Sequence, residues 1–170
     1  MIRKPLAGIF FDAGNTLLVE EPGKHLWEMA MTPIPDVLEV LTALKPHYRL
    51  GVISNTVGSG DAELAEALEK AGILRLIDAM VTSRDFGKAK PDPAIYAEGA
   101  RRLGVPLAET VMVGDRLDTD VAGALNAGIP GVWLRHPGAI AIPGIAPTHV
   151  IDGLAELPGW LDATYVQDRR

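Results

Sequence analysis

The sequence alternates short apolar runs with segments of helical periodicity, and this alternation restricts the fold more than any other feature. Apolar runs of strand length lie at residues 6–11, 50–53, 79–82, 110–113 and 131–134. A helical pattern follows Pro33 and Pro35, and further helical patterns cover residues 62–71, 93–103 and 118–127. Strands and helices that alternate at this spacing form right-handed βαβ crossovers. The sequence therefore predicts an α/β fold, a three-layer sandwich with a central parallel sheet.

The ends of the helical segments carry the residues that usually start and stop helices. Gly72, Gly104 and Gly128 each end one segment, and each precedes a β-branched residue. Asp61 and Asp92 are expected to be N-caps, the second followed by Pro93 at the first helical position. These signals fix the expected helix boundaries.

Composition limits the classes of protein to which the chain could belong. Its 170 residues, 48% apolar and 22% charged, suit one globular domain spanning residues 1–170. The absence of cysteine excludes disulfides, Cys-ligated metals and thiol nucleophiles. A net charge of −6 argues against nucleic acid as a partner, and no apolar run is long enough to cross a membrane. We therefore expect a cytoplasmic protein.

Polar residues follow the predicted strands at the edge where parallel sheets bind ligands. Asp12 ends the first run, Ser54 the second, Asp115 follows Val111–Gly114, and Lys90 precedes a helix. A single Asp after a strand is often only a turn former or a helix cap. Together, two carboxylates, a hydroxyl and an ammonium group can hold a hard cation, expected to be Mg²⁺, and a phosphate.

Four segments in order carry a resemblance to a known family. They are Phe10-Phe11-Asp12-Ala13-Gly14-Asn15-Thr16-Leu17, Val52-Ile53-Ser54-Asn55, Lys90-Pro91-Asp92-Pro93 and Val113-Gly114-Asp115-Arg116-Leu117-Asp118-Thr119-Asp120. These segments resemble the motifs of the haloacid dehalogenase superfamily, over residues 8 to about 135. The resemblance implies a Rossmann-like fold and a phosphatase-like hydrolase.

The resemblance also implies a role for each matching residue. Asp12 would attack phosphorus to form an aspartyl-phosphate, and its other oxygen would bind Mg²⁺ with Asp115. Ser54 and the backbone amides that follow it, at Asn55 and beyond, would hold the phosphoryl oxygens. Lys90 would offset the negative charge of the nucleophile and the phosphate. Asp120 would orient Lys90 or metal-bound water. Thr16 would support the first loop through hydrogen bonding. Lys88 could replace Lys90, but the Lys-Pro-Asp-Pro context favours Lys90.

Gly14 departs from the pattern of the family's phosphatases. They carry a second aspartate two residues after the nucleophile, which protonates the leaving alcohol and then activates water. The backbone carbonyl of Gly14 could still bind the metal, but the acid is lost. Because such an acid typically contributes ~10²–10⁴-fold in rate, we expect slow hydrolysis of alkyl phosphates and a preference for good leaving groups.

The loss of this acid leaves other functions open. A non-catalytic module that binds a phosphate ligand or a protein is the main alternative. Dehalogenases and phosphonate hydrolases of the superfamily also lack the second aspartate, but they fit less well. Dehalogenases work without metal, whereas residues 114–120 have the metal-type pattern, and phosphonate hydrolases use a lysine from a cap domain.

No substantial cap domain is expected between the first two motifs. Residues 18–32 allow only a flap or a minimal insertion, so the site should be open to a phosphorylated small molecule or to an exposed phosphate on a larger substrate. This segment is fairly apolar. It could pack on its own domain or contact a second copy in a homo-oligomer.

Overall fold

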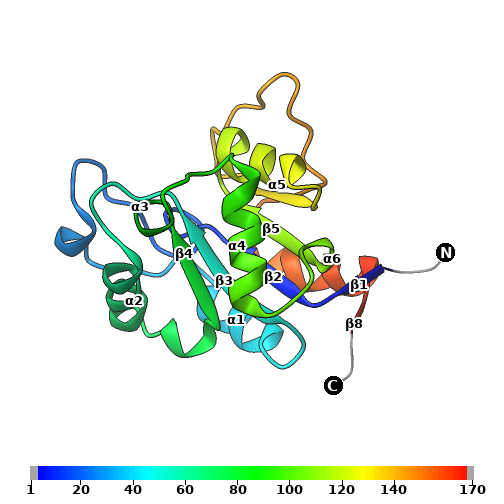
Figure 1. Cartoon of the computed structure of the whole chain (residues 1–170), viewed down its shortest axis with the longest axis horizontal. Helices are drawn as coiled ribbons and strands as arrows, with labels where there is room; N and C mark the ends of the chain where they lie inside the picture. The colour runs from blue at the N-terminus through cyan, green and yellow to red at the C-terminus, as the bar shows by residue number, and fades with distance from the viewer. Residues whose placement is uncertain (1–3, 168–170) are drawn as a thin grey trace.

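The computed structural model describes residues 4–167, and within them a six-stranded parallel sheet forms the centre of the molecule (Figure 1). In spatial order the strands are β4 (Ala79–Thr82), β3 (Arg49–Ser54), β2 (Gly8–Phe11), β5 (Thr110–Gly114), β6 (Gly131–Leu134) and β7 (His149–Ile151). All neighbouring pairs are parallel. The predicted α/β architecture is confirmed.

Helices cover both faces of this sheet because successive side chains of a strand point to opposite faces. Ile9 and Phe11 belong to a core cluster with helices on one face, whereas Phe10 belongs to a second cluster on the other. The first face carries α1 (Val37–Leu44), α2 (Asp61–Lys70) and α6 (Leu157–Thr164), and the second carries α4 (Pro93–Leu103) and α5 (Ala122–Asn126). The sheet is therefore the middle layer of a three-layer sandwich.

The first strand differs from its predicted bounds. Residues 4–6 form a separate strand, β1 (Lys4–Leu6), which pairs with β8 (Tyr165–Gln167) in a two-stranded sheet. The break falls at Ala7, whose N–H donates to Glu109 O and whose carbonyl accepts from Arg49 N. The apolar run at residues 6–11 thus changes pairing partners midway, which a hydropathy pattern does not show.

The helix caps match the sequence prediction in one case and differ in the other. Asp92 accepts a hydrogen bond from Ala94 N at 2.8 Å, as expected of an N-cap before Pro93. The predicted N-cap role of Asp61 is wrong, because Gly60 is the N-cap of α2. The carboxylate of Asp61 instead accepts hydrogen bonds from Thr82 and pairs with Arg102 across the fold.

The helix predicted at residues 118–127 starts with a wider turn. A π-helical turn at Leu117–Val121 precedes α5. Tyr96, which is buried on α4, donates its hydroxyl toward the carbonyls of Thr119 and Asp120, 3.1 Å from each. The π-turn therefore packs on α4, and this packing sets the position of Asp120.

Residues 18–32 form a loop with one 3-10 turn at Leu26–Glu28, and this loop lines a cavity together with Ser54 and Asn55 at the carboxyl end of β3. Val19 N donates to Thr32 O at 2.8 Å, which closes the base of the loop. Leu26 and Met29 pack against the core of their own chain. We call this loop the flap. No helix within residues 4–167 is long and apolar enough to cross a membrane.

Candidate active site

Three adjacent strands end at one edge of the sheet and place Asp12, Ser54 and Asp115 there. Asp12 follows β2, and its N–H donates to Val113 O of β5 at 3.0 Å. Ser54 is the last residue of β3, and Asp115 follows β5. The chain adds β3 and β4 on one side of β2 and then continues with β5 on the other side, so the strand order reverses beside β2. Parallel sheets bind ligands at the carboxyl ends of the strands at such a reversal.

Lys90 reaches this edge from the loop between α3 (Ser83–Phe86) and α4. Its Nζ lies 2.8 Å from Asp12 Oδ1 and 2.8 Å from Asp120 Oδ1, and it donates to Ile53 O at 2.6 Å. Burial alone would lower the pKa of Lys90, but the two carboxylates outweigh burial and raise it. The ammonium therefore stays charged between two carboxylates.

Asn55 holds the backbone of Lys90 in place. Its Nδ2 donates to Lys90 O at 2.9 Å, and its Oδ1 accepts from Lys90 N at 2.8 Å. The side chain of Asn55 is therefore occupied with Lys90, so its predicted phosphate contact would come from its backbone amide. Lys88 points elsewhere, since its exposed ammonium lies 3.6 Å from Asp92.

Asp120 is fixed from two sides. Its Oδ1 pairs with Lys90, and its Oδ2 accepts from Arg116 N at 3.0 Å. Burial raises the pKa of Asp120 to about 6, since the charge of Asp12 adds to burial and Lys90 only partly opposes them. Gly114 makes room for this carboxylate, because a Cβ at position 114 would collide with it.

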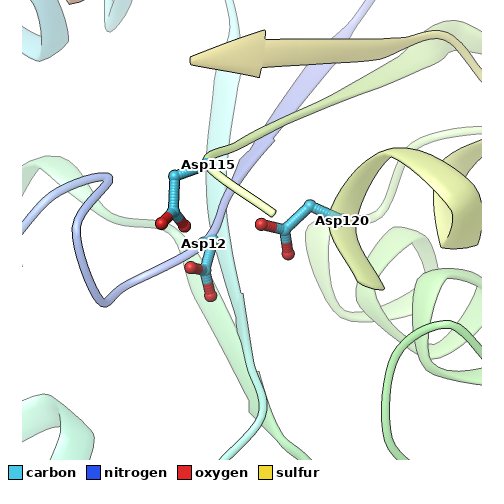
Figure 2. A group of neighbouring side chains, drawn as sticks. All are labelled: Asp12, Asp115 and Asp120. Atoms are coloured by element: carbon cyan, nitrogen blue, oxygen red, sulfur yellow. The ribbon is translucent and has the colours of Figure 1, made fainter. Parts of the chain in front are cut away.

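The three aspartates form a compact group of oxygens (Figure 2). One carboxylate oxygen from each of Asp12, Asp115 and Asp120 lies within 4.8 Å of the others. Burial, together with the charges of Asp12 and Asp120, raises the pKa of Asp115 to about 7. Asp115 Oδ1 is buried and accepts no hydrogen bond from the described residues. Such an oxygen-rich group with an unsatisfied carboxylate fits a hard divalent cation.

Thr16 and Gly14 lie in the loop that follows Asp12. The hydroxyl of Thr16 is buried without a hydrogen-bond partner among residues 4–167, so its predicted supporting hydrogen bond is not seen there. Its backbone N–H donates to Ala13 O at 3.4 Å instead. Gly14 is half-buried beside the carboxylate of Glu20.

Two cavities open at this edge. The first, which we call the phosphate cavity after the ligand that the sequence predicts, measures about 310 Å³. It is lined by Asp12, Gly14, Glu20, Ser54, Asn55, Lys90, Asp115, Arg116 and Thr119. The flap cavity, also about 310 Å³, lies between the flap and residues 54–64 and includes the apolar residues Leu18, Val19, Leu26, Met29, Val57 and Leu64. Gly14, Glu20, Ser54 and Asn55 line both cavities.

Glu20, Arg116 and Thr119 also line the phosphate cavity, although the sequence motifs assign them no site role. Arg116 and Thr119 stand inside the segment that contains Asp115, so their position in that motif could have indicated them. Glu20 could not have been found in this way, because its approach to Gly14 depends on the path of the flap.

Comparison with known proteins identifies the family of the chain. The sequence profile of haloacid dehalogenase-like hydrolases matches residues 15–134, which is more than half of the chain. The chain belongs to this family. The family membership that the four motifs predicted is therefore confirmed.

Relatives of this haloacid dehalogenase-like hydrolase include named phosphatases. The pyrimidine 5'-nucleotidase YjjG of Escherichia coli is 31% identical over 86% of this chain and 67% of its own. The human N-acylneuraminate-9-phosphatase is 33% identical over 89% of this chain and 62% of its own. An uncharacterized protein from Listeria monocytogenes serotype 4b superposes with a TM-score of 0.80 at 26% identity, covering 94% of this chain and 98% of that one. The hydrolase thus spans about two thirds of the length of these two curated relatives.

Proposed function

We propose that the chain is a Mg²⁺-dependent phosphatase that hydrolyses phosphate monoesters through an aspartyl-phosphate on Asp12. One observation carries this proposal: buried Lys90 lies between Asp12 and Asp120, beside the unsatisfied oxygen of Asp115. This arrangement joins a fixed nucleophile, a buried cation and a metal-binding carboxylate. The relatives that are named as phosphatases or nucleotidases support the same reaction.

We assign a separate role in phosphoryl transfer to each of several residues of the phosphate cavity. Asp12 attacks phosphorus, and Lys90, which fixes the Asp12 carboxylate, offsets the negative charge of the bound phosphate. The hydroxyl of Ser54 and the backbone amide of Asn55 hold the phosphoryl oxygens. Asp120 keeps Lys90 in position, and Thr16 lies buried in the loop that follows Asp12.

Mg²⁺ would be held by Asp12, Asp115 and the carbonyl of Gly14, where its charge would offset that of the phosphoryl group. The carboxylate of Asp120 is committed to Lys90 and Arg116, so we assign it to positioning rather than to the metal. Gly14 itself supplies no side-chain acid, unlike the aspartate expected there.

The shape of the site suggests the kind of substrate. The phosphate would occupy the phosphate cavity, and the organic part would extend into the partly apolar flap cavity. The substrate would be a phosphorylated small molecule or an exposed phosphate on a larger one, and not nucleic acid. We further propose that residues 1–170 act as one domain with the flap at 18–32 in place of a cap.

A panel of phosphate monoesters assayed with and without Mg²⁺ tests this function. We expect Mg²⁺-dependent release of inorganic phosphate. Saturable binding of phosphate ligands without turnover would instead favour the non-catalytic binding module. Release of halide from a haloacid without metal would favour a dehalogenase.

Mg²⁺ is expected to stabilise the protein more at about pH 8 than at about pH 5. The carboxyl of Asp115 has a pKa raised to about 7, so it must lose a proton before it can bind metal at the lower pH. Without metal, the contribution of Asp115 to stability is present below its usual pKa and is lost as pH rises through about 7. Mg²⁺ binding offsets that loss. Thermal unfolding with and without MgCl₂ measures the difference.

Asp115→Asn is the control for this measurement. The amide removes the titrating carboxylate, so the stabilisation by Mg²⁺ should become small at both pH values. An equal stabilisation of wild type at both pH values would contradict the raised pKa of Asp115. Undiminished stabilisation of Asp115→Asn by Mg²⁺ would contradict the role of Asp115 as a metal ligand.

A further inference from the structure

Cleavage of a phosphate ester needs a proton donor where the phosphate meets the leaving group. The departing alkoxide of an alkyl phosphate is a poor leaving group unless it is protonated as the P–O bond breaks. In this structure, that place is the junction of the phosphate cavity and the flap cavity, and four residues line both. Of the four, only Glu20 carries an acidic side chain.

The carboxylate of Glu20 approaches the position that a side chain at residue 14 would occupy. A Cβ placed on Gly14 would lie 3.1 Å from Glu20 Oε2 and 3.4 Å from Glu20 Cδ. The flap therefore brings a carboxylate from six residues further along the chain to the place where Gly14 has no side chain.

Contacts with the first loop hold Glu20 there. Asn15 Nδ2 donates to Glu20 Oε2 at 3.2 Å, and Glu20 N donates to Asn15 Oδ1 at 3.0 Å. Asn15 has a φ of 54°, a left-handed conformation that asparagine tolerates better than most residues. Its carbonyl lies 2.6 Å from His136 Nε2, which ties the loop to the segment after β6. The position of Glu20 is thus set by side-chain and backbone contacts together.

The other carboxylates of the phosphate cavity are less suited to this task. Asp12 is bound by Lys90 and is the nucleophile of the proposed function. Asp115 is placed in the metal site, and Asp120 lies behind Lys90 with only 1% of its side chain exposed. Glu20 is solvent-exposed and lines both the phosphate cavity and the flap cavity.

We propose that Glu20 is the general acid and base of this hydrolase, replacing the aspartate that Gly14 lacks; this inference rests on the proposed phosphatase function. As Asp12 forms its bond to phosphorus and the P–O bond to the leaving group breaks, the protonated carboxyl of Glu20 gives its proton to the departing oxygen. Glu20, now a carboxylate, then takes a proton from water as the water oxygen attacks phosphorus. Inorganic phosphate leaves, and the Asp12 carboxylate and the Glu20 acid are regenerated. The strong leaving-group preference expected from Gly14 alone should therefore be muted while Glu20 is present.

A leaving-group series with the Glu20→Gln variant tests this role in the full chain with Mg²⁺. For alkyl phosphates we expect kcat/KM to fall by on the order of 10²–10³-fold. For p-nitrophenyl phosphate, whose leaving group needs little protonation, we expect a fall of less than about tenfold. The plot of log kcat/KM against leaving-group pKa should become steeper, which a merely structural role for Glu20 would not cause. Glu39→Gln, an exposed acid on α1 outside both cavities, should match wild type.

The double variant Gly14→Asp/Glu20→Gln shows whether Glu20→Gln loses activity because the acid is missing or because the fold is disturbed. An aspartate at position 14 should restore much of the alkyl phosphatase activity that Glu20→Gln loses. In the single variant Gly14→Asp, the new carboxylate would crowd Glu20 Oε2, so a smaller gain is expected. Equal losses on alkyl and aryl phosphates in Glu20→Gln, or no loss on either, would overturn the role of Glu20 and leave the phosphatase function standing. Wild type without Mg²⁺-dependent turnover of p-nitrophenyl phosphate would overturn both.

Discussion

Asp12→Asn is expected to lower phosphatase activity by about 10³-fold or more while the fold is retained. Asparagine has nearly the same shape as aspartate, so it can keep the position after β2. It lacks the carboxylate that would attack phosphorus and bind Mg²⁺. It also replaces the partner of Lys90, whose Nζ lies 2.8 Å from Asp12 Oδ1. Release of inorganic phosphate from p-nitrophenyl phosphate measures the loss.

Asp36→Asn is a matched control for this substitution. Asp36 precedes α1 with a φ of 67°, a left-handed conformation that asparagine also adopts, and it is exposed and outside the phosphate cavity. Its activity should equal that of wild type. Activity of Asp12→Asn near the wild-type level would contradict the assignment of Asp12 as the nucleophile.

Lys90→Met is expected to reduce both activity and stability. Methionine fills a similar volume but leaves Asp12 and Asp120 buried without the ammonium that pairs with both. Removal of one partner of a buried ion pair typically lowers the free energy of unfolding by about 3–5 kcal/mol. Activity should fall by about 10²–10³-fold, because Asp12 and the bound phosphate lose the buried ammonium that offsets their negative charge. Denaturant unfolding and steady-state kinetics measure the two effects.

The loss of stability in Lys90→Met should be smaller at about pH 4 than at about pH 8. Without the ammonium, the buried carboxylates bind protons more tightly in the folded state than in the unfolded state, so stability falls as pH rises. Lys88→Met is the control, since Lys88 is exposed and its pairing with Asp92 at 3.6 Å is worth little. Equal stability of Lys90→Met and wild type would show that the buried ion pairs do not hold this edge together.

Much of the fold and part of the site could be predicted because they depend on local patterns. A buried parallel strand reads as an apolar run, so β2, β3 and β5 identify the residues that follow them. The carboxyl ends of such strands share one edge, which is why Asp12 and Asp115 could be placed together. The segment containing Lys90 was identified by its motif, and the same segment contains the N-cap Asp92.

Other features could not be predicted because they depend on contacts between distant segments. β7 and β8 have three residues each, too few for a periodic signal. The side chain of Asn55 is used to hold Lys90, 35 residues away, and no local pattern indicates that pairing. The approach of Glu20 to Gly14 likewise requires the folded flap. The sequence alone therefore indicates a missing acid where the structure shows a nearby carboxylate.

Transfer of a phosphoryl group to Asp12 is tested most directly by an acid-quench experiment. The enzyme is mixed with Mg²⁺ and a phosphate monoester, quenched in acid during turnover, digested and analysed by mass spectrometry. We expect a base-labile phosphoryl group on the peptide that contains Asp12, and no such group on that peptide in Asp12→Asn. Hydrolysis by wild type at full rate, with no phosphoryl group on that peptide at any quench time, would contradict it.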